Sequence, residues 1–322
     1  MNLSHWIRRL TLLISLAFLS TQVAAQGDLI RIVYTFGAGG SGDVTGRLIA
    51  EHMRKSLGVP VVIENKVGAG GRIAVAAVKA AAPDGKNLLL AFMGTMVILP
   101  HTVDNVPFDP FKDFAPVAHI ADSPLALTVA STTQARDVKE YVAQVKSGRT
   151  PGFYGVAPLG GLPHFLGLQF AALNGIELSA VGYKGGAQMA QSIVAGEVSA
   201  TFSTPADLVP LHKSGKARIL AVTATMRTSL LPEVPTFKEA GFDVQASTWL
   251  GLFAPKGTPP AAVDRIATAV AAALKDPAIA ARISDMGMEP TGHGPAVLGE
   301  AMRADFDRWG PVIKASGYRT GE

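Results

Sequence analysis

The segment from residue 29 to residue 92 alternates between strand and helix patterns, and this order limits the fold more than any other feature. Apolar, β-rich runs cover residues 30–36, 60–64 and 88–92, and helix patterns cover residues 43–57 and 73–82. A β-α-β-α-β order predicts a parallel, doubly wound sheet, because each helix returns the chain to the same edge by a right-handed crossover. We therefore predict an α/β fold.

A second series of elements begins at Leu125, after a proline-rich stretch. A strand predicted at residues 248–254 leads back to the first series, and helical patterns follow it. Because 322 residues are too many for one small core, we predict two α/β lobes. The first lobe comprises residues 26–124 and 250–322, and the second comprises residues 125–249. The second lobe is predicted to contain strands at residues 125–130, 153–156, 180–183, 198–203 and 219–223.

The N-terminal residues 1–25 have the pattern of a secretory signal peptide. Arg8 and Arg9 precede an apolar run at residues 10–19 that is too short to span a bilayer, and small residues at 23–25 predict cleavage before Gln26. An uncut N-terminal membrane anchor is the alternative. With no cysteine to carry a lipid and no later apolar run of membrane-spanning length, we predict a free protein in the periplasm.

The composition excludes several classes of protein. Hydrophobic residues make up 48% of the chain and charged ones 17%, which is incompatible with disorder. The net charge of +4 is spread along the chain without a basic run, so we expect no nucleic-acid partner. There is no cysteine, and the seven histidines do not occur at metal-ligand spacing. The chain also lacks a G-x-S-x-G elbow and a P-loop, which favours binding over catalysis.

A glycine loop at residues 37–42 joins the first strand to the first helix. Backbone N–H groups in such a loop, together with the positive end of the helix, form an anion site. Ser41 or Asp43 is a candidate for the helix cap. A second glycine loop at residues 68–71 and the pair Gly94-Thr95 follow the next two strands, so we expect them at the same sheet edge, where ligands bind in such folds.

The same loop permits a competing interpretation. Gly37, Gly39 and Gly42 match G-x-G-x-x-G, and Glu64 ends the next strand, as in a dinucleotide fingerprint whose acid holds the ribose. An exported dinucleotide-dependent oxidoreductase is therefore the alternative function, and an exported hydrolase of unfamiliar type is a third. His164 follows a loop rich in glycine and proline, and Lys184 follows a predicted strand. Each of these residues either has a structural role or contacts a ligand in the cleft.

The chain resembles the solute receptors of tripartite tricarboxylate transporters, also called Bug-type receptors. The resemblance covers almost all of the mature chain and is specific because many modest motifs occur in order. These motifs are FGAGGSGD at residues 36–43, VIENKVGAGG at 62–71, APDG at 82–85, FDP at 108–110, DFAPV at 113–117, YKGG at 183–186, LPEVPT at 231–236, EAG at 239–241 and APKGTP at 254–259.

The resemblance implies a type II-like periplasmic binding protein, with two doubly wound lobes joined by a two-segment hinge and a ligand cleft between them. Such a protein closes over a small carboxylate-bearing ligand and delivers it to a membrane permease, without cofactor, metal or chemical step. We expect a monomer. Docking of the loaded receptor on a sensor kinase ectodomain is a further partner compatible with this fold.

The resemblance also implies the ligand-binding residues, which we carry over by position. Both lobes contribute backbone amides and hydroxyl groups, because a carboxylate needs donors rather than a paired cation. The implied residues are Phe36, Gly37, Ala38, Gly39, Gly40, Ser41, Asp43 and Thr95 from the first lobe, and Gly155, Val156, Ala157, His164, Ser203, Thr204 and Thr223 from the second.

Departures from the family pattern narrow the expected ligand. Gly37 stands where the family usually has proline, and the loop at residues 155–164 has Val156, Leu159 and Leu162 where the family has serines and glycines. A citrate-like ligand would lack donors in such a pocket. We therefore predict a ligand with one or two carboxylates and an apolar body, aliphatic or aromatic. Asp43 either caps the helix or receives the ammonium of an amino acid.

Overall fold

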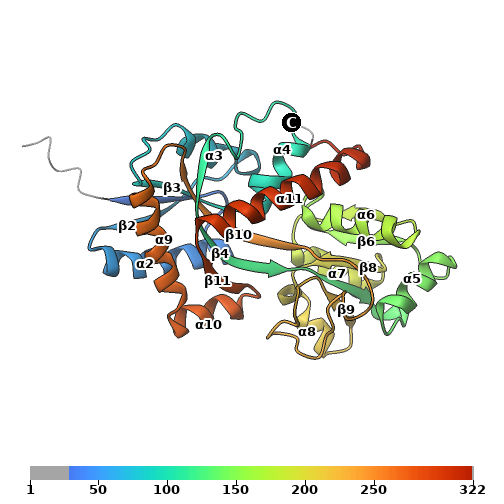
Figure 1. Cartoon of the computed structure of the whole chain (residues 1–322). Helices are drawn as coiled ribbons and strands as arrows, with labels where there is room; N and C mark the ends of the chain where they lie inside the picture. The colour runs from blue at the N-terminus through green and yellow to red at the C-terminus, as the bar shows by residue number, and fades with distance from the viewer. Residues whose placement is uncertain (1–28, 321–322) are drawn as a thin grey trace, which may run out of the picture.

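The computed structural model describes residues 29–320, which form two α/β units side by side (Figure 1). The predicted signal peptide at residues 1–25 lies outside the described residues. One unit contains a six-stranded sheet and the other a five-stranded sheet, and helices cover both. We call these units lobe 1 and lobe 2. The predicted architecture of two α/β lobes is confirmed.

Lobe 1 begins with the parallel core that the sequence pattern predicted. Strand β1 pairs in parallel with both β2 and β3, and helices α2 and α3 are the crossovers between them. Residues of β3 are buried on both faces, as expected for a central parallel strand. The first elements of this lobe are β1 (Ile30–Tyr34), α2 (Ser41–Leu57), β2 (Val61–Asn65), α3 (Arg72–Lys79), β3 (Asn87–Phe92), α4 (Leu99–Thr102) and β4 (Phe114–Pro124).

The C-terminal part of the chain completes lobe 1. The predicted return strand is present, and it lies antiparallel between β3 and β4. The strand order of the sheet is β11-β4-β10-β3-β1-β2. Strands β4 and β11 were not predicted, because prolines at positions 116, 124 and 290 interrupt their apolar patterns. The returning elements are β10 (Ser247–Pro255), α9 (Pro260–Leu274), α10 (Pro277–Asp285), β11 (Glu289–His293) and α11 (Pro295–Ser316).

Lobe 2 contains a mixed sheet with the order β7-β6-β8-β5-β9. Strand β6 pairs in parallel with β7 and β8, whereas β5 pairs antiparallel with β8 and β9. The predicted strands are present, and their bounds differ from the prediction by at most two residues. The elements are β5 (Ala126–Ala130), α5 (Val138–Lys146), β6 (Phe153–Val156), α6 (Leu162–Asn174), β7 (Ser179–Gly182), α7 (Gly186–Ala195), β8 (Ala200–Ser203), α8 (Val209–Lys213) and β9 (Ala217–Val222).

Two chain segments connect the lobes, one between β4 and β5 and the other between β9 and β10. Thr223 ties them together: its hydroxyl accepts the N–H of Leu125 at 2.8 Å and points at the carbonyl oxygens of Leu125 and Ala246. We therefore propose a hinge here, with lobe boundaries at residues 124/125 and 249/250. Helix α11 of lobe 1 makes a further connection, since it runs across the molecule to lie against α6 (Figure 1).

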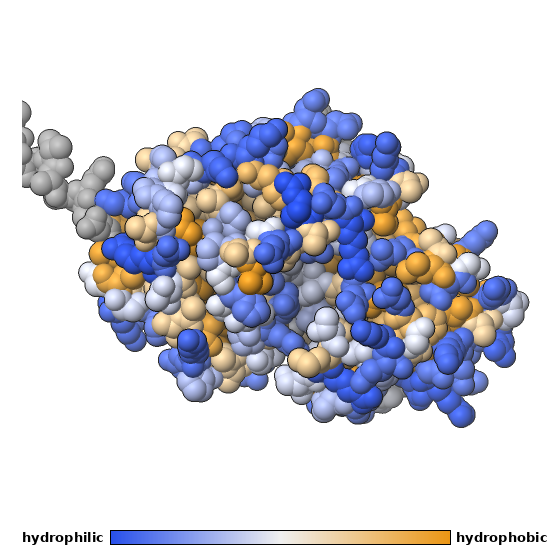
Figure 2. Space-filling model, viewed as in Figure 1, coloured by the Kyte–Doolittle hydropathy of each residue, from blue (hydrophilic) through white to orange (hydrophobic). Residues whose placement is uncertain are grey.

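The surface is mixed in character. Figure 2 shows hydrophilic side chains over most of the visible face, with apolar ones in smaller separate areas. No helix within residues 29–320 is long and apolar enough to cross a membrane.

Candidate functional site

A cavity of about 310 Å³ lies between the two lobes. Because both lobes line it, a change in the angle between them changes its shape. Lobe 1 contributes Ser41, Phe92, Gly94 and Ser123, and lobe 2 contributes Leu125, Ala157, Pro158, Gly161, Leu162, Pro163, Gly186, Met189, Ser203 and Thr204. Thr248, at the beginning of β10 and close to the proposed 249/250 boundary, also lines the cavity.

Three helices begin at this cavity: α2 at Ser41, α6 at Leu162 and α7 at Gly186. The residue before each start is a glycine, and none of the three helices has a side-chain cap, so the first N–H groups of α2 and α7 are available to a ligand. At α6 only the N–H of Leu162 is available, because Pro163 has no N–H and His164 donates to the Gly161 carbonyl at 3.1 Å. Each helix also presents the positive end of its dipole. The cavity is therefore electropositive, although none of the described residues that line it is ionisable.

Hydroxyl groups and apolar side chains share the rest of the lining. Ser203, at the end of β8, is 6% exposed, and its Oγ has no hydrogen-bond partner within the described residues. Phe92, Leu162 and Met189 supply apolar surface. The cavity can therefore hydrogen-bond an anionic group through donors and enclose a hydrocarbon body.

Four of the predicted binding residues line the cavity: Ser41, Ala157, Ser203 and Thr204. Phe36 lies next to it, because its ring packs 5.8 Å from that of Tyr34 and 6.3 Å from that of Phe92. The loop residues between Phe36 and Ser41 are exposed and lead directly into α2 without lining the cavity; they are Gly37, Ala38, Gly39 and Gly40.

Five other predicted residues do not line the cavity: Thr95, Gly155, Val156, His164 and Thr223. Thr95 is buried against Gly71, and Val156 belongs to the lobe 2 core. Gly155 is covered by the side chains of Met189, Tyr183 and Val198, and Thr223 belongs to the proposed hinge.

His164 stabilises the loop that precedes α6. Its Nδ1 accepts the N–H of Gly160 at 3.2 Å, and its ring packs between Phe165 and Tyr318, with centroids 4.9 Å and 5.1 Å away. Burial lowers the pKa of this imidazole, which therefore stays neutral as a hydrogen-bond acceptor. Since Tyr318 follows α11, the His164 ring is also a contact between the lobes.

Residues 45–318 match the family described as tripartite tricarboxylate transporter family receptor. The chain belongs to this receptor family. The resemblance inferred from the sequence motifs is thereby confirmed. As a member of a family of non-enzymatic binding proteins, the receptor is not the oxidoreductase that the glycine loop also suggested. Glu64, the acid of that alternative, forms an ion pair with Lys66 at 2.8 Å.

Relatives of known structure share both sequence and fold with the receptor. MatC from Rhodopseudomonas palustris, solved with bound malate, is 31% identical, with a TM-score of 0.72, over 88% of this chain and 98% of that chain. Rpa4515 from R. palustris, solved with adipate, is 32% identical, with a TM-score of 0.75, over 90% of this chain and 97% of that chain. Protein BugT of Bordetella pertussis is 27% identical, covering 99% of both chains. The receptor is thus a periplasmic-type solute-binding protein.

Asp43 does not have the position expected of the helix cap. The N-cap of α2 is Gly40, and the Asp43 carboxylate instead accepts the N–H of Gly39 at 2.9 Å from within the first turn. Hydrogen bonds from Arg47 are the main cause that lowers the pKa of Asp43 to about 2. Both carboxylate oxygens are occupied, so this residue offers no site for the ammonium of an amino acid. Lys184 is exposed and does not line the cavity either.

Several residues that line the cavity were not predicted from the sequence. Ser123 and Thr248 are direct neighbours across the β4–β10 pair, and nothing local in the sequence indicates that these two strands meet. Gly186 had a usable signal, because a glycine pair that follows a strand and opens a helix repeats the pattern of the first loop. Phe92, Leu125 and Met189 read as ordinary core residues.

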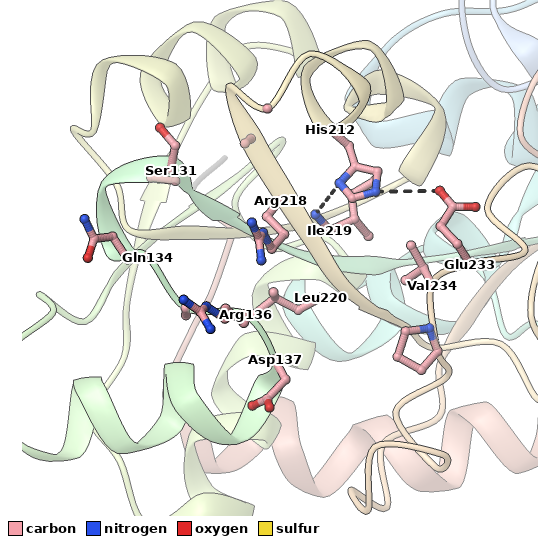
Figure 3. A pocket seen from close by; sticks show the side chains of 15 residues that line it. Ser131, Gln134, Arg136, Asp137, His212, Arg218, Ile219, Leu220, Glu233 and Val234 are labelled. Atoms are coloured by element: carbon pink, nitrogen blue, oxygen red, sulfur yellow. Dashed lines mark hydrogen bonds and ion pairs between the residues drawn. The ribbon is translucent and has the colours of Figure 1, made fainter.

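A second concavity, of about 390 Å³, lies on lobe 2 alone and includes Arg136 and Arg218 (Figure 3). His212 in its wall accepts the N–H of Ile219 at 3.2 Å and lies 3.7 Å from a Glu233 carboxylate oxygen. Although it is larger than the interlobe cavity, no residue of lobe 1 lines it. A hinge motion between the lobes would not close it, so the interlobe cavity is the candidate site.

Proposed function

We propose that the receptor captures an organic acid with one or two carboxylates in the interlobe cavity and delivers it to a membrane permease. The observation that carries this proposal is the convergence of three uncapped helix starts on a cavity whose described lining contains no ionisable side chain. Such a cavity stabilises a carboxylate through N–H donors and helix dipoles. It offers a cation no counter-charge.

The lining also supports an apolar ligand body. Phe92, Leu125, Leu162 and Met189 supply apolar surface to the lining, and both lobes supply hydroxyl groups. A short dicarboxylate can meet the α2 start with one end and the α6 and α7 starts with the other. The relatives solved with malate and adipate bind molecules of this kind. An aromatic acid presents one carboxylate and a larger apolar face to the same surfaces.

Capture follows from the division of donors between the lobes. A ligand that contacts only one lobe gains only part of the available hydrogen bonds, whereas a closed receptor supplies donors from both. Ligand binding therefore shifts the population toward the closed state by the difference between these interactions. The hinge at Thr223 is the segment about which we propose that this motion occurs.

Location and partners belong to the same proposal. We propose a periplasmic monomer, exported by the cleavable signal peptide at residues 1–25, with the permease of a tripartite tricarboxylate transporter as its partner. Family membership supports the transporter, and the N-terminal pattern supports export. Sensing, with a kinase ectodomain as partner, uses the same capture step.

The experiment is a thermal-shift screen of residues 26–322 with adipate, malate, benzoate, citrate, aspartate and NAD. A ligand at one hundred times its dissociation constant stabilises the folded state by about 2.7 kcal/mol. For a chain of this size this raises the Tm by roughly 4 °C. Calorimetry with Ser41→Trp, which fills the cavity, is the control. Binding of citrate or aspartate in preference to the other acids would contradict the proposed ligand class.

A further inference from the structure

The loop that precedes α2 has few packing contacts of its own. A side chain at Gly37, Gly39 or Gly40 would meet no atom within 4 Å, and Phe36 is 42% exposed. Gly39 also has a φ of 89°, which disfavours other residues. A free glycine loop samples many conformations and loses entropy when it is ordered. This loop nevertheless determines where Ser41 and the first N–H groups of α2 lie.

Two side chains outside the cavity fix the two ends of this loop. The Asp43 carboxylate accepts the Gly39 N–H at 2.9 Å. The Asn65 amide, at the end of β2, donates to the Phe36 carbonyl at 3.1 Å. The loop is therefore held through its backbone, and the strand end sets its distance from the sheet.

Arg47 joins these two side chains into one network. It donates to both Asp43 oxygens at 3.0 Å and to the Asn65 Oδ1 at 3.0 Å, and the Asn65 amide donates to Asp43 at 2.9 Å. Both N–H groups and the oxygen of Asn65 are thus used. The Asp43 side chain is 3% exposed, whereas that of Arg47 is 52% exposed. Arg47 therefore covers the buried carboxylate from the solvent side.

The network also compensates the negative charge of Asp43, which would otherwise oppose anion binding. Asp43 places a negative charge in the first turn of the helix whose start faces the anion cavity, and a ligand carboxylate would be repelled by it. The bidentate contact with Arg47 compensates this charge locally. The helix start can then attract an anion while the carboxylate orders the loop.

From this network we infer that Asn65 and Arg47 are positioning residues for ligand capture, although neither lines the cavity. Asn65 determines the path of the loop, and Arg47 cancels the charge of Asp43. This inference rests on the proposed role of the cavity as a carboxylate site. It assigns a role to the asparagine of the VIENKVGAGG segment, which the proposed function leaves unexplained.

The first test compares Asn65→Ala with Glu64→Gln, using adipate and malate in calorimetry. Glu64 is the neighbouring residue of the same strand, and its carboxylate contacts Lys66 rather than the loop. We expect Asn65→Ala to weaken binding at least tenfold and Glu64→Gln to leave it within twofold. Amide hydrogen exchange on the ligand-free proteins is the second readout, with faster exchange at Gly39 in Asn65→Ala only. Equal exchange and equal affinity in both variants would refute the role of Asn65.

The second test isolates charge. In Arg47→Met, at an exposed position where folding is expected to survive, Asp43 is left uncompensated. We expect adipate affinity to fall at least tenfold at low salt and to recover as salt screens the repulsion. Adding Asp43→Asn should restore much of the affinity, because the Asn Oδ1 still accepts the Gly39 N–H. A loss in Arg47→Met that is independent of salt and not restored would refute the electrostatic role.

The outcomes separate this inference from the proposed function. If the unaltered receptor binds none of the carboxylates, the proposed function is wrong, and hydrogen exchange at Gly39 still decides whether Asn65 orders the loop. If the receptor binds adipate or malate and the Asn65 and Arg47 variants bind equally well, the cavity is a carboxylate site and the positioning role is wrong.

Discussion

Replacing Ser203 by alanine should change stability and binding in opposite directions. In the ligand-free protein the Oγ of Ser203 is buried without a partner within the described residues. A buried, unsatisfied hydroxyl lowers stability, so its removal should raise the free energy of unfolding by about 1 kcal/mol. A substitution that damages the fold would instead lower the free energy of unfolding.

The effect on affinity follows from the proposed contact with the ligand. A hydrogen bond from Ser203 to a carboxylate contributes about 1.5–3 kcal/mol, because one partner is charged. Its loss should raise the dissociation constant roughly 10- to 150-fold. Urea denaturation of the ligand-free protein measures the first quantity, and calorimetry with adipate or another acid from the screen measures the second.

Thr128→Val is the matched control. Thr128 lies in β5 of the same sheet, and its buried Oγ1 also has no partner within the described residues, but it does not line the cavity. We expect a similar gain in stability with unchanged affinity. The reasoning is refuted if Ser203→Ala lowers stability by more than 1 kcal/mol or leaves the dissociation constant unchanged.

Three further predictions concern the fold around the site. The pKa of Asp43 in the folded protein is about 2, which is below its ordinary value. The ionised carboxylate therefore adds roughly 1–2 kcal/mol to the free energy of unfolding after allowance for solvent screening, and this contribution is lost as the pH falls from about 4 to 2. Urea denaturation of wild type and Asp43→Asn should give converging stabilities at the low end of this pH range. Thr223→Val should lower stability by about 1–3 kcal/mol in the same assay, since it leaves the Leu125 N–H unpaired. Gly42→Ala should lower the Tm, because its methyl group would overlap aromatic side chains of the β1–β3 core.

The sequence predicted features that neighbouring residues encode. Alternating apolar patterns gave the parallel β1, β2 and β3 core, and glycines between a strand and a helix marked the start of α2 as a place for an anion. Ser41 and Ser203 were predicted from the family resemblance, and both line the interlobe cavity. These features depend on backbone conformations that a few adjacent residues determine.

The tertiary structure decided which residues meet across the cavity. Ser123 and Thr248 become neighbours only because β10 returns to pair with β4, and Asp43 meets Asn65 only because β2 lies beside β1. The same packing places the His164 ring against Tyr318 and outside the lining of the cavity, although the family resemblance implies a binding residue at this position. Contacts between distant segments depend on the packing of the whole chain. Local pattern therefore identified where donors could occur, and strand pairing and lobe packing determined which of them share one cavity.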